Sequence, residues 1–330
     1  MLKFSNICFY GGGAWGQALS ITLASLGLGS TLITSDSKRA KDINSGYSER
    51  FPEIKISDLI HASPNSQEII RKSDLIFITT ESKRVMSVIE ELSKIGSNNI
   101  NIIITSKGFA AKNGETFSKV IERKFPIFKT GVLTGPTFAD EIARNMPAAA
   151  VLASNDNNYA KSICNLFQNS CLRLYQSDDP LGASIAGAVK NIIAIGAGII
   201  HGLNLGDNAK AALITRGISE TSRLIKASGG NYETAFGLAG IGDMSLTCGG
   251  PHSRNMAYGI NLVQDANKIE KLDLVEGLNA LESTISLSKK LNIELPIVEA
   301  INQILNENGD IKEIISKLLS RPIKNEFLAI

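Results

Sequence analysis

Residues 6–19 read Asn-Ile-Cys-Phe-Tyr-Gly-Gly-Gly-Ala-Trp-Gly-Gln-Ala-Leu, and they carry the strongest fold signal in the sequence. Its apolar part, Ile7 to Tyr10, has the length and composition of a buried strand. Glycines follow, and from Ala18 to Leu28 the apolar residues recur at the spacing of a helix. A strand, a glycine turn and a helix in this order are typical of the first unit of a doubly wound α/β domain.

The glycines at 11, 13 and 16 fit the pattern G-x-G-x-x-G. Gly11 permits a tight turn, Gly13 lets the backbone approach a pyrophosphate, and Gly16 lets the helix pack on the strand. The helix start also offers free N–H groups and the positive end of its dipole. Glycine-rich turns are common in loops, but the strand before and the helix after favour a dinucleotide site.

Composition narrows the class of protein. The 330 residues are 43% hydrophobic and 20% charged with a net charge of +2, which predicts two domains and indicates neither nucleic acid nor a membrane surface as a partner. The cysteines and histidines are scattered, so we expect no metal site and a reducing cytoplasmic setting. The start lacks a signal-peptide pattern, and the longest apolar stretch, 192–200, is far shorter than the roughly 20 residues of a membrane span.

Alternating strands and helices extend to about residue 178, which predicts a parallel sheet with helices on both faces. No convincing strand follows residue 180, and a series of helices is expected instead. We therefore predict a dinucleotide-binding domain over 1–180 and an all-helical substrate and catalytic domain over 181–330. The expected strands lie near 7–10, 31–34, 54–56, 74–79, 100–105, 131–133, 147–153 and 172–175, and the later helices near 181–200, 208–227, 256–262, 276–291, 296–306 and 311–319.

Charged side chains follow the second predicted strand, where a dinucleotide fold reads the adenosine ribose. Ser35 and Asp36 come first, and Lys38 and Arg39 follow. An acidic residue there favours NAD, and basic residues favour the additional phosphate of NADP. A solvated turn fits these residues almost as well, so the choice between the cofactors stays open.

Two further turns lie at the carboxyl ends of predicted strands, where ligands bind in open α/β sheets. Lys107 follows the strand at 100–105, although an exposed loop lysine would look the same. The turn 134–139 opens a helix that Thr137 is expected to cap.

The second half contains three polar groups in unusual settings. Lys190, followed by Asn191, lies in an apolar helix, where an isolated ammonium is costly and a shifted pKa suits a general acid or base. Asp243 is placed to hold such an ammonium, although a helix-capping aspartate is equally compatible. Arg254, between Ser253 and Asn255, offers the donors that a phosphate requires, although surface arginines are common.

Taken together, these motifs resemble the bacterial NAD(P)-dependent glycerol-3-phosphate dehydrogenase family over nearly the whole chain. The first motif is generic to dinucleotide enzymes, whereas the later motifs in this order are highly specific. The matching stretches are GGGAWGQAL at 11–19, TSKG at 105–108, TGPTFADEIA at 134–143, GAVKNIIAIGAGI at 187–199, NAKAALITRGISE at 208–220, GIGDMSLTC at 240–248, SRN at 253–255 and VEG at 275–277.

The resemblance implies a Rossmann-like sheet domain followed by a helical domain like the C-terminal domain of 6-phosphogluconate dehydrogenase. It implies reduction of dihydroxyacetone phosphate to sn-glycerol 3-phosphate with NADH or NADPH, without a metal, for phospholipid synthesis. Lys190 would be the general acid and base, Lys107 its electrostatic partner, and Asp243 would orient Lys190.

The resemblance also carries binding roles onto individual residues of this sequence. The cofactor would contact Gly11, Gly13, Ala14, Trp15, Gly16, Ser35, Lys107, Ala139, Arg254, Leu274 and Glu276. The substrate would contact Lys107, Gly135, Thr137, Lys190, Asn191, Asp243, Thr247, Ser253, Arg254 and Asn255.

The sequence departs from the family at two places. The loop 79–83 has Thr80 near the position of a usual proline, and Ser35 stands where relatives often carry a basic residue. Two other functions remain open: a related β-hydroxyacid-type reductase that acts on a carboxylate, and a dinucleotide-binding regulatory protein without turnover. The partners expected are small molecules, and a homodimer is compatible with the sequence.

Overall fold

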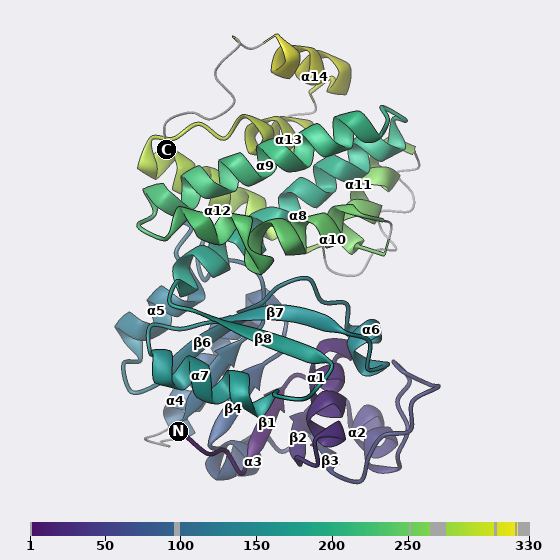
Figure 1. Ribbon diagram of the computed structural model, residues 1–330, viewed down its shortest axis with the longest axis vertical. Helices are drawn as coiled ribbons and strands as arrows, with labels where there is room; N and C mark the ends of the chain where they lie inside the picture. The colour runs from purple at the N-terminus through teal and green to yellow at the C-terminus, as the bar shows by residue number, and fades with distance from the viewer. Residues whose placement is uncertain are drawn as a thin grey trace. The chain divides into compact units, whose positions relative to one another are not determined.

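The computed structural model describes residues 2–95, 100–250, 252–264, 275–306, 309–320 and 322. The chain divides into two compact units. The first consists of Met1–Ala110 and Thr116–Ser184, and the second of Ala111–Glu115 and Ile185–Ile330. Figure 1 labels most of the helices and strands of both units.

The first unit is built on an eight-stranded sheet with the order β3-β2-β1-β4-β5-β6-β7-β8. Neighbouring strands from β3 to β6 are parallel, so the doubly wound fold is confirmed. The order reverses at β1, and ligands bind at such a switch point. The strands are β1 (Ile7–Tyr10), β2 (Ser30–Ile33), β3 (Ile60–Ser63), β4 (Leu75–Ile78), β5 (Asn101–Ile104), β6 (Lys129–Thr134), β7 (Ala148–Ala153) and β8 (Leu172–Ser177).

Two details of the predicted sheet are wrong. The expected strand at 54–56 is irregular chain, because Ile54 and Ile56 pack into the hydrophobic core, and β3 lies at 60–63 instead. The sheet is also not wholly parallel, since β7 runs antiparallel to β6. A parallel crossover usually contains a full helix, whereas the β6–β7 connection contains only the five-residue α6 (Ala139–Ala143).

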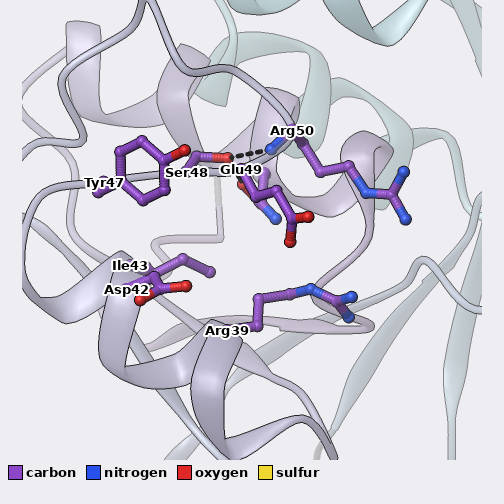
Figure 2. A pocket seen from close by; sticks show the side chains of 8 residues that line it. Arg39, Asp42, Ile43, Tyr47, Ser48, Glu49 and Arg50 are labelled. Atoms are coloured by element: carbon purple, nitrogen blue, oxygen red, sulfur yellow. Dashed lines mark hydrogen bonds between the residues drawn. The ribbon is translucent and has the colours of Figure 1, made fainter.

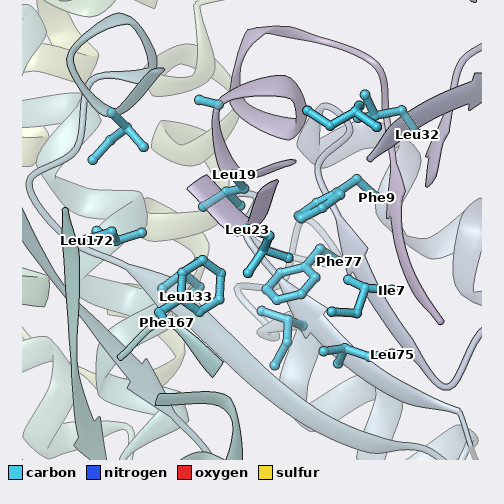
Figure 3. Packing of buried hydrophobic residues seen from close by; sticks show 14 of the residues in the cluster. Ile7, Phe9, Leu19, Leu23, Leu32, Leu75, Phe77, Leu133, Phe167 and Leu172 are labelled. Carbon is cyan, nitrogen blue, oxygen red and sulfur yellow. The ribbon is translucent and has the colours of Figure 1, made fainter. Parts of the chain in front are cut away.

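Helices cover both faces of this sheet. Side chains of α1, α6 and α7 pack on one face, and those of α3, α4 and α5 pack on the other. Figure 3 shows the first cluster, where Phe9 stacks on Phe77 with ring centroids 4.9 Å apart and Phe167 meets Phe77 edge-on. The helices are α1 (Ala14–Ser25), α2 (Ser37–Asn44), α3 (Ser66–Lys72), α4 (Ser82–Ile95), α5 (Phe117–Lys124), α6 and α7 (Asn157–Leu166).

The described part of the second unit contains helices and no strand, which confirms the predicted helical half. Helix α8 begins at Pro180 in the first unit and continues through the second. It is long and apolar enough to cross a membrane, but 94% of its most apolar stretch is buried, as in the core helices of soluble proteins. The helices are α8 (Pro180–Gly202), α9 (Asp207–Ala227), η1 (Tyr232–Phe236), η2 (Leu238–Gly242), α10 (Asp243–Cys248), α11 (Arg254–Gln264), α12 (Glu276–Leu291), α13 (Pro296–Asn306) and α14 (Ile311–Leu319).

A buried carboxyl group from α9 caps the N-terminus of α13. The two oxygens of Glu220 accept hydrogen bonds from the N–H groups of Ile297 (2.7 Å) and Val298 (3.2 Å). Burial raises the pKa of Glu220 to about 7, against the lowering effect of these donors and of Arg223, while Glu299 adds to the rise. The folded state therefore holds this proton at a higher pH than the unfolded chain does.

This cap predicts a specific dependence of stability on pH. Since the pKa of Glu220 is raised from 4.5 to about 7, its contribution to stability is full below pH 4.5 and is lost as the pH rises through 7. Glu220→Gln cannot titrate, so the difference in unfolding free energy between wild type and variant should change by up to about 3 kcal/mol across this range. Urea unfolding at both ends of the range measures it. A difference that does not vary with pH would contradict the prediction.

Candidate functional site

The glycine turn at the head of α1 has a geometry that only glycine permits. Gly11 has a φ of +132°, and a Cβ there would lie 2.8 Å from the Thr79 carbonyl carbon. A Cβ on Gly16 would lie 2.2 Å from the Gly11 carbonyl oxygen. Gly13 precedes α1 without a side-chain cap, and a Cβ there would enter open space. The first N–H groups of α1, including those of Ala14 and Trp15, therefore fit the pyrophosphate of a dinucleotide.

A small pocket lies beside this turn (Figure 2). The sequence patterns did not predict it. The Gln17 side chain donates to the Gly12 carbonyl (2.9 Å), and Ser48 donates to the Gln17 side chain (2.5 Å). Because two arginines face the pocket together with two acids, its charge does not select an anion. Its lining residues are Gln17, Arg39, Asp42, Ile43, Tyr47, Ser48, Glu49 and Arg50.

Asp36 follows β2 and caps α2. Its carboxylate accepts a hydrogen bond from Arg39 N (3.0 Å) and pairs with the Arg39 guanidinium (3.3 Å). The backbone hydrogen bond from Arg39 is the main reason why the pKa of Asp36 lies below its usual value. Asp36 is thus an ionised, exposed carboxylate beside Ser35, at the position where a dinucleotide fold reads the ribose.

Two predicted substrate groups converge on one carbonyl at the carboxyl edge of the sheet. Lys107 Nζ donates to the Gly135 oxygen at 3.3 Å, and the Thr137 hydroxyl donates to the same oxygen at 3.3 Å. The prediction that Thr137 caps α6 is therefore wrong, because its hydroxyl turns back to Gly135. Phe138 is the cap residue, without a side-chain hydrogen bond, and Ala139 begins the helix.

The atypical loop at 79–83 is tied to the glycine turn and to the strand beside it. The Thr79 hydroxyl donates to the Gly11 oxygen (2.9 Å), and the Ser106 hydroxyl donates to the Thr80 oxygen (2.5 Å). The Thr80 hydroxyl is buried without a partner among the described residues. The Thr79 side chain thus ties this loop to the glycine turn, whereas Thr80 is held through its carbonyl oxygen and not through its side chain.

The second unit buries an ion pair around Lys190. The Lys190 Nζ atom lies 3.2 Å from Asp243 Oδ1 and donates to the Thr247 hydroxyl at 2.8 Å. Lys190 is 7% exposed and Asp243 1% exposed. Thr247 in turn donates to the Asp243 carbonyl oxygen at 2.6 Å. Both Asp243 and Thr247 belong to α10, so one short helix supplies an anion and a hydroxyl to the ammonium that α8 carries.

A neighbouring amide network joins α8, α11 and α12. Asn255 donates to the Asn191 side chain (2.9 Å) and accepts from the Gly277 N–H group (2.9 Å), while Asn191 donates to Glu276 (3.4 Å). Residues 191 and 190 are adjacent on α8, so this network lies next to the ion pair in the chain. The structure thereby brings Asn191, Asn255 and Glu276 together.

The remaining predicted residues are placed as follows. Ser253 is buried and its hydroxyl accepts a hydrogen bond from Met256 N (3.3 Å) at the start of α11. Arg254 is exposed and is the first residue of that helix. Leu274 lies outside the described residues. Within the described ranges, no group of three or more histidine, cysteine or acidic side chains is arranged to hold a metal ion.

Comparison with known proteins identifies the family of this chain. The family described as NAD-dependent glycerol-3-phosphate dehydrogenase matches with its N-terminal part over residues 6–160 and with its C-terminal part over 179–316. A glycerol-3-phosphate dehydrogenase [NAD(P)+] of Fusobacterium nucleatum is 37% identical over 336 residues, with 99% of each chain covered. The enzyme of the same description from Francisella tularensis is 39% identical, covering 97% of this chain and 99% of its own.

A solved structure supports the same assignment. The crystal structure of glycerol-3-phosphate dehydrogenase from Coxiella burnetii superposes with a TM-score of 0.90 at 32% identity, covering 96% of this chain and 99% of that one. Both the sequence and the fold are thus shared over nearly the whole length. The chain belongs to the NAD-dependent glycerol-3-phosphate dehydrogenase family.

Proposed function

We propose that this protein reduces dihydroxyacetone phosphate to sn-glycerol 3-phosphate with NADH or NADPH, in the cytoplasm, for the synthesis of glycerophospholipids. The observation that carries the chemistry is the buried Lys190 ammonium between Asp243 (3.2 Å) and Thr247 (2.8 Å). Family membership supplies the substrate and the cofactor. We propose a homodimer as the assembly.

Lys190 is the proposed proton donor to the substrate. The nicotinamide supplies a hydride to the carbonyl carbon, and the carbonyl oxygen must then take up one proton to become a hydroxyl. Lys190 gives that proton, and Asp243 and Thr247 hold its ammonium in place. Positioned proton donation contributes roughly 10²–10⁴-fold to a rate. In the oxidative direction Lys190 takes the proton back.

The other predicted residues bind and polarise the two molecules. Lys107 is the proposed electrostatic partner for the charge that develops on the carbonyl oxygen. Arg254, with Ser253 and Asn255, is the proposed phosphate grip, because a planar guanidinium and several donors match a dianion. Residues 1–180 are proposed to bind the cofactor and 181–330 the substrate. The remaining contacts proposed for the substrate are Gly135, Thr137, Asn191 and Thr247, and those proposed for the cofactor are Gly11, Gly13, Ala14, Trp15, Gly16, Ser35, Ala139, Leu274 and Glu276.

Asp36 is expected to lower the affinity for NADPH. Its ionised carboxylate at the end of β2 suits a ribose hydroxyl and repels the 2′-phosphate of NADP. Asp36→Asn keeps a helix-capping side chain and removes the charge, so kcat/KM for NADPH relative to NADH should rise about two- to fivefold, the usual range for a screened surface charge. Steady-state kinetics with both cofactors measures this ratio. An unchanged ratio would remove Asp36 from the ribose site.

Oxidation of NADH and NADPH with dihydroxyacetone phosphate as acceptor tests the proposed function directly. Turnover with either cofactor is expected. If a 2-keto carboxylate is turned over and the phosphate ester is not, the protein is a reductase of the β-hydroxyacid type instead. Nucleotide binding without oxidation of either cofactor, on any phosphorylated ketone, would indicate a regulatory protein.

A further inference from the structure

The chain makes an unusually wide helical turn directly before Asp243. In η2, which is a π-helix, the Gly237 carbonyl accepts hydrogen bonds from the N–H groups of Gly240 and Gly242, each at 3.2 Å. A π-turn holds more residues than an α-turn and is found mostly as a single turn, often at functional sites. Here η2 ends at Gly242, and α10 begins with Asp243 itself.

Gly240 is the residue that makes this turn possible. A Cβ on Gly240 would lie 2.0 Å from the Ala235 carbonyl oxygen and 2.5 Å from its carbon. Both atoms belong to the backbone of η1, and Ala235 is fully buried. The backbones of η1 and η2 are thus in direct contact, and any side chain at position 240 would push them apart.

The width of the turn determines the direction of the Asp243 carboxylate. One residue corresponds to a rotation of about 100° in an α-helix. A tighter turn would therefore rotate the start of α10, and Asp243 Oδ1 would no longer lie 3.2 Å from Lys190. Thr247, one turn further on, would move with it and lose its 2.8 Å contact with the same ammonium.

We propose, on the basis of the function proposed above, that Gly240 is a positioning residue for proton transfer. It holds η2 against η1, and η2 in turn presents Asp243 and Thr247 to Lys190. The ammonium is thereby kept both protonated and fixed in direction, because a buried ammonium without its carboxylate loses its proton more readily.

Gly240→Ala tests this role, and Gly237→Ala is the matched control in the same segment. Gly237 has a φ of −94° and a ψ of −167°, which alanine adopts, and a Cβ there would lie 3.7 Å from its nearest neighbour. We expect Gly240→Ala to lower kcat about 10- to 100-fold, the usual result of misplacing a reacting group. The alkaline limb of its kcat–pH profile should move to lower pH, while the Kd for NADH stays unchanged. Gly237→Ala should behave as wild type.

A double-mutant cycle separates positioning from general loss of structure. In an Asp243→Asn background, Gly240→Ala should lower kcat by a clearly smaller factor than in the wild-type background, because the carboxylate that Gly240 positions is already neutral and only the Thr247 contact remains to be lost. Full additivity of the two effects, or an unshifted pH profile, would overturn the proposal.

If Gly240→Ala fails to fold, deletion of Ile241 is a second variant that tests the same proposal. Ile241 is 40% exposed, and its loss removes one residue from the turn while leaving Gly240 in place. The deletion should lower kcat and shift the pH profile in the same way, and wild-type kinetics in this variant would also overturn the proposal. If the wild-type protein itself fails to reduce dihydroxyacetone phosphate, the proposed function fails, which is a separate outcome.

Discussion

Lys190→Met is expected to lower kcat for the reduction of dihydroxyacetone phosphate by roughly 10²–10⁴-fold. Methionine fills a similar volume but has no proton to give to the carbonyl oxygen. The Kd for NADH should stay unchanged, because the glycine turn at the head of α1 is the proposed pyrophosphate site. Steady-state oxidation of NADH measures kcat, and the fluorescence of bound nucleotide measures the Kd. Full activity would remove Lys190 from the mechanism.

The control for Lys190→Met concerns stability. Asp243 is 1% exposed, so the variant retains a buried carboxylate without this ammonium. Breaking a buried pair in this way costs about 3–5 kcal/mol. The double variant Lys190→Met/Asp243→Asn should recover much of that loss in denaturant unfolding and none of the activity. Recovery of activity along with stability would show that Lys190 acts through folding alone.

The sheet-containing half of the fold could be predicted because its sequence signals are local. A buried strand followed by Gly11, Gly13 and Gly16 predicts a tight turn, and the structure confirms it, since Gly11 has a positive φ and neither Gly11 nor Gly16 leaves room for a side chain. Gly13 differs from them, because the space beside it is open. Periodicity was sufficient to locate most strands and all of the long helices.

Other features of the fold depend on contacts that periodicity does not encode. The run around Ile56 looks like a strand, but it is apolar because it packs into the core. The reversal of β7 depends on the short α6, and short helices carry little periodic signal. Thr137 follows the rules for a helix cap, yet its hydroxyl donates to the Gly135 carbonyl two residues before it.

The candidate site also contains residues that the sequence predicted and features that it did not. The unusual position of Lys190 in an apolar helix indicated a buried partner, and Asp243 is that partner at 3.2 Å. The part that Thr247 plays between them had no signal apart from the family resemblance. The π-turn of η2 was also missed, because a wide turn is created by backbone contact with Ala235 and not by a residue pattern. Gly240 is the residue of the sequence that this wide turn requires.

Gly259→Ala is expected to destabilise the protein strongly, because α8 and α11 cross with their backbones in contact. A Cβ on Gly259 would lie 2.1 Å from the Ile195 carbonyl oxygen and 2.9 Å from the Ile199 nitrogen. A Cβ on Gly198, on the opposite helix, would lie 2.1 Å from the Met256 carbonyl oxygen. Backbone atoms cannot rotate away, so the two helices must separate.

The net loss of stability from Gly259→Ala should be about 2 kcal/mol or more. Overpacking a core costs typically about 1–3 kcal/mol and occasionally more, and the higher helix propensity of alanine returns about 1 kcal/mol. Gly217→Ala in α9 is the matched control, because the three atoms nearest to a Cβ there belong to the side chain of Ile193, at 3.0–3.1 Å, and not to backbone. A side chain can adjust, so the control should stay within about 1 kcal/mol of wild type. Denaturant unfolding measures both variants, and equal effects would contradict the prediction.

We expect the crossing of α8 and α11 to affect the proposed substrate site as well as stability. Asn255 lies on α11 one turn before Gly259, and its 2.9 Å hydrogen bond to Asn191 depends on the close approach of the two helices. If Gly259→Ala separates them, Asn255 and the adjacent Arg254 move away from α8, and KM for dihydroxyacetone phosphate should rise by more than that for NADH. Gly217→Ala leaves this crossing intact and should leave both KM values unchanged. A variant that loses stability but keeps its KM would show that the asparagine pair contributes to folding and not to the substrate site.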